Sequence, residues 1–187
     1  IDFCEVFNTI EGCVKGADLI VLCVPVGAMQ ATMEAAAPYL EKGAVVTDVG
    51  SVKSNVIKAI NPIIPEGIFF VPAHPIAGTE NSGPKAGFAE LFNGRWCILT
   101  PTSETPVGVI NKVRDFWTLL GADVQEMDAN HHDLVLSVTS HAPHLIAFTM
   151  VGVADEFSKV TKSEVINYSA AGFRDFTRLA ASDPVMW

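Results

Sequence analysis

Short apolar, β-branched-rich runs alternate with helical segments over the first two-thirds of the chain, and this alternation constrains the fold most. The runs are DLIVLCV (18–24), AVVTDV (44–49), IFFV (68–71) and RWCILT (95–100), and the more polar ADVQEM (122–127) is predicted as a last strand. Continuous apolar runs such as the first are typical of strands that are covered on both faces. Strands separated by helices at this spacing predict βαβ units, and therefore an α/β fold with a mostly parallel, doubly wound sheet.

The segments between the strands carry helix signals. Helices are predicted over 28–40, 51–60 and 105–120. Gly43 follows the first helix, Ser51 is expected to cap the second, and Thr105 with Pro106 marks the start of the third. The fold class expected for this part is a Rossmann-type sheet.

The pattern changes after Asp128, where almost all signals are helical. Helices are predicted over 129–157 and 162–169, and a third after Gly172. We therefore predict two domains, an α/β domain over 1–127 and an all-α domain over 128–187.

Composition excludes several classes of protein. The chain is 49% hydrophobic and 18% charged, which is enough apolar material for a core and argues against disorder. The net charge of −9 argues against a general nucleic-acid surface, but permits a local cationic pocket. Four cysteines form no CxxC pair, and we expect Cys23 and Cys97 to be reduced core thiols of a cytosolic protein. No uninterrupted apolar run reaches the length of a membrane span, and no leader pattern opens the chain.

Ligands of open α/β sheets bind beyond the carboxyl ends of the strands, and two such ends carry suggestive residues. In CVPVGAM the chain passes from a strand over Val24, Pro25 and Val26 into a helix. In DVGSVK, Gly50 permits close backbone approach and Ser51 heads a helix whose N–H groups can meet an anion or a ribose. A plain βα turn and a plain helix cap are the alternatives.

A third strand end carries HPIAGTENSG, residues 74–83. A neutral imidazole at His74 could accept a proton from a substrate hydroxyl, whereas the alternative is a hydrogen-bonded core histidine. The stretch GTENSGPK is close to a phosphate-binding P-loop, but Pro84 separates Gly83 from Lys85 and removes an N–H from the loop. A nucleoside-triphosphatase is therefore not expected.

The helical part contains three polar groups. In SHAPH, His141 and His144 share one helical face, and NHHD lies at 130–133. Neither SHAPH nor NHHD matches HExxH, and no cysteine is close in sequence. We therefore predict that these residues form a polar pocket wall and bind no metal; the alternative is that they lie in an ordinary helix without a functional role. In GFRDFTRLAASDPVMW, Asp175 and Arg178 are three apart, so the carboxylate could hold the guanidinium toward a substrate carboxylate; a solvated charged face is the alternative.

Together and in this order, these segments resemble the prephenate and arogenate dehydrogenase family of tyrosine biosynthesis. The matching segments are VPV, DVGSVKS, HPIAGTENSG, GRWCILTP, SHAPHLIAF and GFRDFTRLAASDPVMW, which span nearly the whole chain. The central loop is most similar to that of bacterial cyclohexadienyl dehydrogenases. The resemblance implies a cytoplasmic, NAD- or NADP-dependent oxidative decarboxylation of prephenate or arogenate, to 4-hydroxyphenylpyruvate or tyrosine.

The resemblance also implies roles for residues. His74 takes the proton of the ring hydroxyl, and Ser51 lies between it and the nicotinamide. The turns with Val24, Pro25, Val26, Gly50 and Ser51 contact the cofactor. Substrate-binding roles fall on Arg178, His141, His144, Thr79, Glu80, Asp175 and Trp187, and Trp187 is expected to reach the partner protomer of a homodimer made by the helical domain.

One departure from the family pattern concerns the cofactor. Such enzymes open with a strand and a GxGxxG turn, and this chain contains no GxGxxG. We therefore expect an internal fragment of a longer enzyme, with partial domains over 1–127 and 128–187, and with weak cofactor binding and activity by itself.

Two other functions are considered. Another dehydrogenase of the 6-phosphogluconate-dehydrogenase-like type would place a catalytic lysine on the first long helix, and Ala129 to Phe157 contains none. A non-catalytic sensing or dimerisation module is favoured by the missing glycine turn and disfavoured by the retained Ser51, His74, His144 and Arg178.

Overall fold

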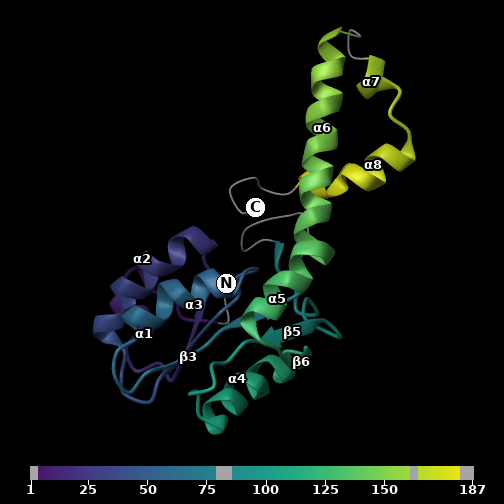
Figure 1. Cartoon of the computed structure of the whole chain (residues 1–187). Coiled ribbons are helices and arrows are strands. Elements are labelled where there is room, and N and C mark those ends of the chain that lie inside the picture. Colours follow the sequence, from purple (N-terminus) through teal and green to yellow (C-terminus); the bar gives the residue numbers. More distant parts are fainter. Residues whose placement is uncertain (1–3, 79–85, 161–163, 182–187) are drawn as a thin grey trace. The chain divides into compact units, whose positions relative to one another are not determined.

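The computed structural model describes residues 4–78, 86–160 and 164–181, and the chain forms two compact units. Unit 1 comprises Ile1–Ala77 and Ala89–Asp133, and unit 2 comprises Gly78–Phe88 and Leu134–Trp187. Figure 1 draws the helices and strands and labels many of them.

Unit 1 contains the alternating strands and helices that the sequence predicts. Its strands are β1 (Leu19–Leu22), β2 (Val45–Asp48), β3 (Phe69–Val71), β4 (Ala73–Pro75), β5 (Trp96–Leu99) and β6 (Asp123–Glu126). Its helices are α1 (Ile10–Val14), α2 (Val26–Ala36) with the short η1 (Ala37–Tyr39), α3 (Ser54–Ile60) with η2 (Asn61–Ile63), and α4 (Val107–Leu119). Helix α5 (Ala129–Leu136) begins in unit 1 and its last residues belong to unit 2.

Strand pairing is mostly parallel, which confirms the predicted Rossmann-type class. β1, β2 and β3 pair in parallel in that order, and Leu22 at the end of β1 lies opposite Asp48 at the end of β2. A second group has the order β4-β5-β6, with β5 and β6 parallel. The exception is β4, which runs antiparallel to β5 and pairs His74 with Ile98. His74 thus lies within its own short strand, and not beyond the end of the strand 68–71 as the sequence suggested.

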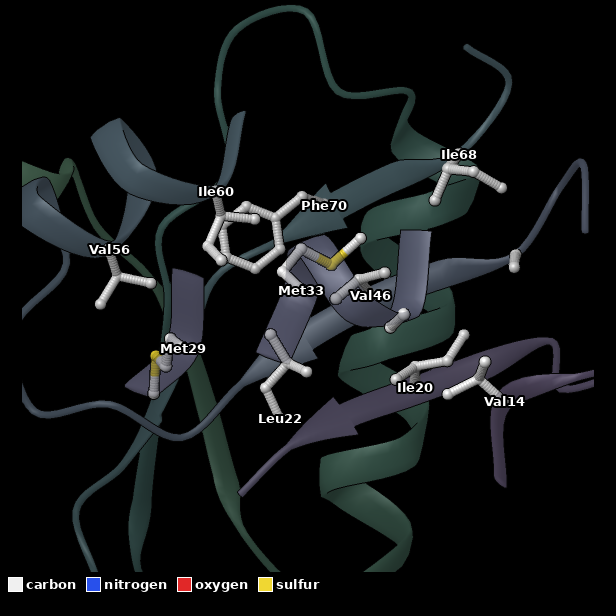
Figure 2. Close-up of a cluster of buried hydrophobic side chains, with 12 residues drawn as sticks. Val14, Ile20, Leu22, Met29, Met33, Val46, Val56, Ile60, Ile68 and Phe70 are labelled. Carbon is white, nitrogen blue, oxygen red and sulfur yellow. The ribbon is translucent and has the colours of Figure 1, made fainter. Parts of the chain in front are cut away.

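Helices cover both faces of the sheet because alternate strand residues point to opposite sides. On β2, Val46 belongs to a core cluster with α2 and α3, while Val45 belongs to a second cluster with α4. Figure 2 shows the first cluster, in which Met33 of α2 and Ile60 of α3 point into the same interior as Phe70 of β3. The sheet is thus doubly covered, as continuous apolar strands require.

A buried ion pair ties the end of β2 to β4. The ammonium of Lys53 and the carboxylate of Asp48 are both fully buried and in contact. Lys53 Nζ also donates to the Ala73 carbonyl at 2.7 Å, and Asp48 accepts from the N–H groups of Gly50 (2.8 Å) and Ala73 (3.1 Å). Burial lowers the pKa of Lys53, and the adjacent carboxylate of Asp48 opposes that shift. These contacts fix the backbone immediately before His74.

The start of α3 is held by Asp133 and not by the predicted cap at Ser51. The helix begins at Ser54, and the Asp133 carboxylate accepts from the N–H groups of Lys53 (2.7 Å) and Ser54 (2.9 Å). Local pattern alone could not show this, because the capping residue comes from 80 positions away in the chain. Burial by itself raises the pKa of Asp133, but hydrogen bonds from Lys53, His132 and Ser54 outweigh it and lower the pKa to about 2.

Two further expectations are corrected in unit 1. The N-cap of α4 is Pro106 and not Thr105, so this helix starts one residue later than predicted. Cys97 is buried in β5 as expected, whereas Cys23 is exposed because β1 ends at Leu22.

Unit 2 is helical, as predicted. It contains the π-helical turn η4 (Ser137–His141), α6 (Ala142–Val160), α7 (Glu164–Asn167), α8 (Ala171–Thr177) and η5 (Arg178–Ala181). The helix predicted over 129–157 is therefore interrupted by η4, shortly before Pro143, which has no N–H for the helical ladder. The segments α7, α8 and η5 all contact α6, and Figure 1 labels α6, α7 and α8.

The stretch Ala129–Val160 is long and apolar enough to cross a membrane by length and composition alone, and 17% of its most apolar window is buried in this chain. One such helix is weak evidence for a membrane span, because helices of soluble proteins meet the same criterion.

Replacement of Asp48 tests the buried ion pair. Asp48→Asn should lower the free energy of unfolding by about 3–5 kcal/mol, because it leaves the buried Lys53 ammonium without its anion. Urea unfolding measures the change. The matched control is Asp18→Asn, which removes an exposed pair with Lys112 and should cost less than about 1 kcal/mol. Similar small effects of both substitutions would contradict the importance of the buried pair.

Acid titration tests the cap at Asp133. A pKa depressed from 3.8 to about 2 means that the folded state favours the carboxylate, so its stabilisation is complete above about pH 4 and is lost as the pH falls through 2. The unfolding free energy of wild-type protein should therefore fall more steeply from pH 4 to pH 2 than that of Asp133→Asn. Urea unfolding at several pH values measures both slopes, and equal slopes would contradict the assignment.

Candidate active site

His74 is a buried imidazole with a defined hydrogen-bond partner. Only 8% of the residue is exposed, and its position in β4 is fixed by the pairing with Ile98. Its Nδ1 lies 2.9 Å from Nε2 of His132. The two rings meet edge to face, with centroids 5.1 Å apart and planes inclined by 67°. The predicted base is therefore oriented by a second histidine.

His132 is in turn bonded to a carboxylate. The residue is fully buried, and its Nδ1 lies 2.9 Å from Oδ1 of Asp133. Asp133 also receives the two N–H groups at the start of α3. A continuous series of hydrogen bonds thus runs from the start of α3 through Asp133 and His132 to His74, all within unit 1.

The N-terminal turn of α5 places His132 and Asp133. Asp128 Oδ1 accepts from the N–H groups of Asn130 (2.9 Å) and His131 (3.0 Å), which fixes the first turn of the helix. Ser54 Oγ donates to Asn130 Oδ1 at 3.1 Å, which links α3 to α5. The sequence predicts a polar pocket wall at NHHD and does not show that His132 and Asp133 are bonded to each other and to His74. Among the described residues, no group of three or more His, Cys, Asp or Glu side chains is arranged to hold a metal ion.

The two predicted cofactor turns lie at the same edge of the sheet. β1 and β2 end side by side at Leu22 and Asp48, and the segments Val24–Val26 and Gly50–Ser51 follow them directly. Pro25 is the N-cap of α2 and provides no side-chain cap. Its carbonyl accepts from the Ala28 N–H at 2.8 Å, which leaves the N–H groups of Val26 and Gly27 at the helix start for a ligand. A helix N-terminus at the carboxyl end of a parallel strand suits the ribose or phosphate of a dinucleotide.

Gly50 is required by close packing at this edge. A β-carbon at this position would lie 2.9 Å from Asp48 Oδ2, closer than β-carbons come to other atoms, and 3.0 Å from the Met29 methyl carbon, which would have to shift. The close approach seen here is made to the chain's own residues, and the approach to a ligand inferred from the sequence stays a prediction. Ser51 is half-buried next to it.

Unit 2 brings together part of the predicted substrate-binding set. His141 lies in η4 and His144 in the first turn of α6, and both are half-buried. Burial lowers the pKa of His144, nearby His141 lowers it further, and a hydrogen bond with the Leu179 backbone partly opposes the shift. Leu179 follows Arg178 in η5, so His144 and the arginine segment lie against each other. Asp175 and Arg178 are exposed in α8 and η5.

Three predicted residues, Thr79, Glu80 and Trp187, lie outside the described residues. Their roles stay predictions, as does the domain boundary near Met127.

Family models match almost the whole chain. The model described as the nucleotide-binding domain of prephenate dehydrogenase matches residues 4–126. The model described as the dimerization domain of prephenate dehydrogenase matches residues 128–187.

Individual relatives agree with these matches. The chain is 47% identical to a cyclohexadienyl dehydrogenase of Zymomonas mobilis over 98% of this chain and 62% of that protein. It is 34% identical to a prephenate dehydrogenase of Bacillus subtilis over 93% of this chain and 47% of that protein. The chain thus spans less than two-thirds of the length of these relatives.

Solved structures are similar as well. A prephenate dehydrogenase of Aquifex aeolicus, crystallised with hydroxyphenyl propionate and NAD+, matches with a TM-score of 0.88 at 35% identity, over 98% of this chain and 63% of that chain. A Synechocystis arogenate dehydrogenase matches with a TM-score of 0.74 at 26% identity, over 95% of this chain and 63% of that chain. On the two family-model matches and these relatives, the chain belongs to the prephenate dehydrogenase family.

Proposed function

We propose that the protein catalyses the oxidative decarboxylation of prephenate, arogenate or both with NAD+ or NADP+, forming 4-hydroxyphenylpyruvate or tyrosine. The observation that carries this proposal is the buried His74, whose ring is oriented by His132 and Asp133 within a chain of this family. The relatives include enzymes named for each substrate, so the proposal covers both. A cytoplasmic location is part of this proposal.

The residues at the ends of β1 and β2 would hold the nicotinamide half of the cofactor. Val24–Val26 with the N-terminus of α2 supplies N–H groups, and Gly50–Ser51 supplies backbone and one hydroxyl. A bound nicotinamide supplies the acceptor for the hydride that leaves the ring carbon bearing the hydroxyl. The match to a nucleotide-binding domain and the NAD+ in the Aquifex structure support this assignment.

His74 would handle the proton of the reaction. As the hydride departs, the hydroxyl proton passes to the His74 imidazole and the carbon–oxygen bond gains double-bond character. Loss of the ring carboxylate as carbon dioxide returns its bonding electrons to the ring, which becomes aromatic. His74 then gives the proton back to the phenolic oxygen, so the protein is unchanged at the end of the cycle. Base catalysis of this kind contributes roughly 10²–10⁴ in rate.

The helical unit would bind the substrate. Arg178 is proposed to pair with a substrate carboxylate, because a guanidinium offers paired donors to a planar anion. His141 and His144 would line the same pocket, and the lowered pKa of His144 favours its neutral form. Asp175, Thr79 and Glu80 would orient or gate the arginine, and Trp187 would reach the partner protomer.

A second candidate function is a non-catalytic sensing or dimerisation module derived from such an enzyme. No GxGxxG occurs in the given sequence, and in dinucleotide-binding folds that turn holds the pyrophosphate, so the two candidates differ in whether the protein binds the cofactor. Calorimetry of the full-length gene product with NAD+ and NADP+ separates the two candidates. Binding would support the enzyme, and no binding would support the module.

Replacement of His74 tests the proposed base. His74→Asn should lower kcat by roughly two orders of magnitude or more and leave the dissociation constant of the substrate nearly unchanged, because the imidazole acts on a proton in the transition state. Steady-state kinetics of the full-length gene product with prephenate and arogenate, each with NAD+ or NADP+, measure this. The control is His131→Asn, an exposed histidine that should keep wild-type kcat. An unchanged kcat in His74→Asn would remove His74 from the mechanism.

A homodimer through the helical unit is the proposed assembly. Exposed apolar side chains on α6 recur at spacings of four and three: Ile146, Met150, Val153, Phe157 and Val160. Such spacing forms one seam along a helix, which is typical of helix–helix packing. The matched dimerization domain supports a second copy of this chain as the occupant.

Replacement of Val153 tests this seam. Val153→Glu should weaken dimerisation by roughly tenfold or more, because each protomer would bury an unpaired carboxylate in the interface. Sedimentation equilibrium of the full-length gene product measures the dissociation constant. Glu156→Gln changes an exposed neighbour outside the seam and should have little effect. A dimer of unchanged strength in Val153→Glu would exclude the seam from the interface.

A further inference from the structure

We propose that His132 and Asp133 are positioning residues that select Nε2 of His74 as the nitrogen that accepts the substrate proton; this inference rests on the proposed role of His74 as the base. Three hydrogen-bonded groups carry it, namely the Asp133 carboxylate, the His132 ring and the His74 ring.

The first step concerns the Asp133 carboxylate, which can only accept hydrogen bonds. Its Oδ1 already receives the Lys53 N–H at 2.7 Å, and its Oδ2 receives the Ser54 N–H at 2.9 Å. A protonated carboxyl would point its O–H at one of these donors, so the arrangement requires the carboxylate. The low pKa of Asp133, about 2, agrees with this. The nitrogen that faces it, His132 Nδ1, must therefore carry a hydrogen and donate it.

The second step passes from His132 to His74. A neutral imidazole carries one N–H and one lone pair, so a His132 that donates from Nδ1 presents the lone pair at Nε2. That lone pair faces His74 Nδ1 at 2.9 Å, so His74 Nδ1 must carry the hydrogen. In neutral His74 the lone pair is then on Nε2, and this nitrogen is the proton acceptor.

The same series of hydrogen bonds also stabilises the product of proton transfer. When Nε2 takes a proton, the resulting imidazolium keeps its Nδ1–H directed at His132, and the charge of Asp133 lies one ring away. Full burial of His132 keeps water from competing for these bonds. A carboxylate that fixes the tautomer of a catalytic histidine and stabilises its cation plays the same part in serine hydrolases. Here a second ring lies between the two.

A different protonation state would give the opposite prediction. A His132 imidazolium would donate from both ring nitrogens, so His74 Nδ1 would have to accept and Nε2 would carry the hydrogen. Such a His74 could not take a proton at Nε2. The tautomer of His74 therefore distinguishes the two arrangements.

Nuclear magnetic resonance of this chain with ¹⁵N-labelled histidine reads the tautomer directly. Long-range ¹H–¹⁵N correlations distinguish a protonated from an unprotonated ring nitrogen, and His74→Asn assigns the signals of His74 among the five histidines. We expect His74 with hydrogen on Nδ1 in the wild-type protein. Hydrogen on Nε2 of neutral His74 would overturn the proposal. This measurement needs neither cofactor nor turnover, so its outcome is independent of the proposed activity.

Two substitutions of His132 separate positioning from packing. His132→Leu fills the buried space but cannot accept from His74, whereas the amide of His132→Gln can accept from His74 and donate to Asp133. In the full-length gene product, His132→Leu should lower kcat roughly 10²-fold with little change in KM, a smaller loss than direct removal of the carboxylate partner causes in hydrolases. His132→Gln should restore most of kcat and keep the hydrogen on Nδ1 of His74.

The matched control is Asn130→Ala. Asn130 lies on α5 with His132 and Asp133, and the substitution removes only its hydrogen bond from Ser54 of α3, so His74, His132 and Asp133 keep their own hydrogen bonds. It should keep both the tautomer and kcat. Equal kcat values for His132→Leu and wild type would overturn the positioning role. Equal losses in His132→Leu and His132→Gln, with the tautomer unchanged in both, would overturn it too, because packing alone would then explain the effect. A wild-type kcat in His74→Asn would instead overturn the proposed function and, with it, the catalytic meaning of the tautomer.

Discussion

The buried ammonium of Lys53 and its backbone N–H join the three segments that carry the candidate site. Through its side chain Lys53 contacts Asp48 at the end of β2 and the Ala73 carbonyl in β4. Through its backbone it donates to Asp133 on α5. The residue after Ala73 is His74, and the residue before Asp133 is His132, so both rings of the histidine pair are adjacent to atoms that Lys53 fixes. The geometry of the pair depends on this one residue more than on any apolar contact.

Joining segments through a buried ion pair costs desolvation free energy. Two charges lose their hydration, and well-packed apolar residues of similar volume often stabilise a protein as much or more. An apolar contact, however, tolerates small displacements, whereas each hydrogen bond fixes a distance and a direction. Proton transfer requires a heavy-atom separation within about 2.6–3.2 Å. We therefore attribute the Asp48–Lys53 pair to the need to place β4 accurately, and not to a need for stability.

The sequence predicted what depends on local pattern and missed what depends on distant contacts. Alternating strands and helices, the helical second half and the burial of Cys97 all follow from hydrophobic runs. The antiparallel β4 was missed because three residues after Pro72 are too few to show a period of their own. The cap of α3 was assigned to Ser51, since nothing in the local sequence shows that Asp133 arrives from elsewhere.

In the candidate site, too, the residues that local motifs mark were predicted, and those placed by distant contacts were not. His74, the two cofactor turns and the helical histidines could be named from motifs and from the family resemblance. His132 and Asp133 stand in NHHD, for which the sequence predicts only a polar pocket wall, because a sequence shows the donor atoms and not which ring they face. Lys53 was noted only as part of DVGSVK, since nothing in the sequence shows that its ammonium is buried. Buried polar networks of this kind connect residues 48, 53, 73 and 133, and such separations leave no periodic signal.

The contrast between His74 and Arg178 follows from the physics of their proposed tasks. The rate of proton transfer falls steeply when the base is misplaced. A base is therefore best held on a strand and in a buried hydrogen-bond network, and His74 is held in this way. Attraction between a guanidinium and a carboxylate falls only as the inverse of distance, and it orients a substrate before contact is complete. An exposed arginine on the short η5 is sufficient for that task. A net charge of −9 therefore does not conflict with the proposed anionic substrate, because in its proposed role Arg178 would determine the local field at the substrate carboxylate.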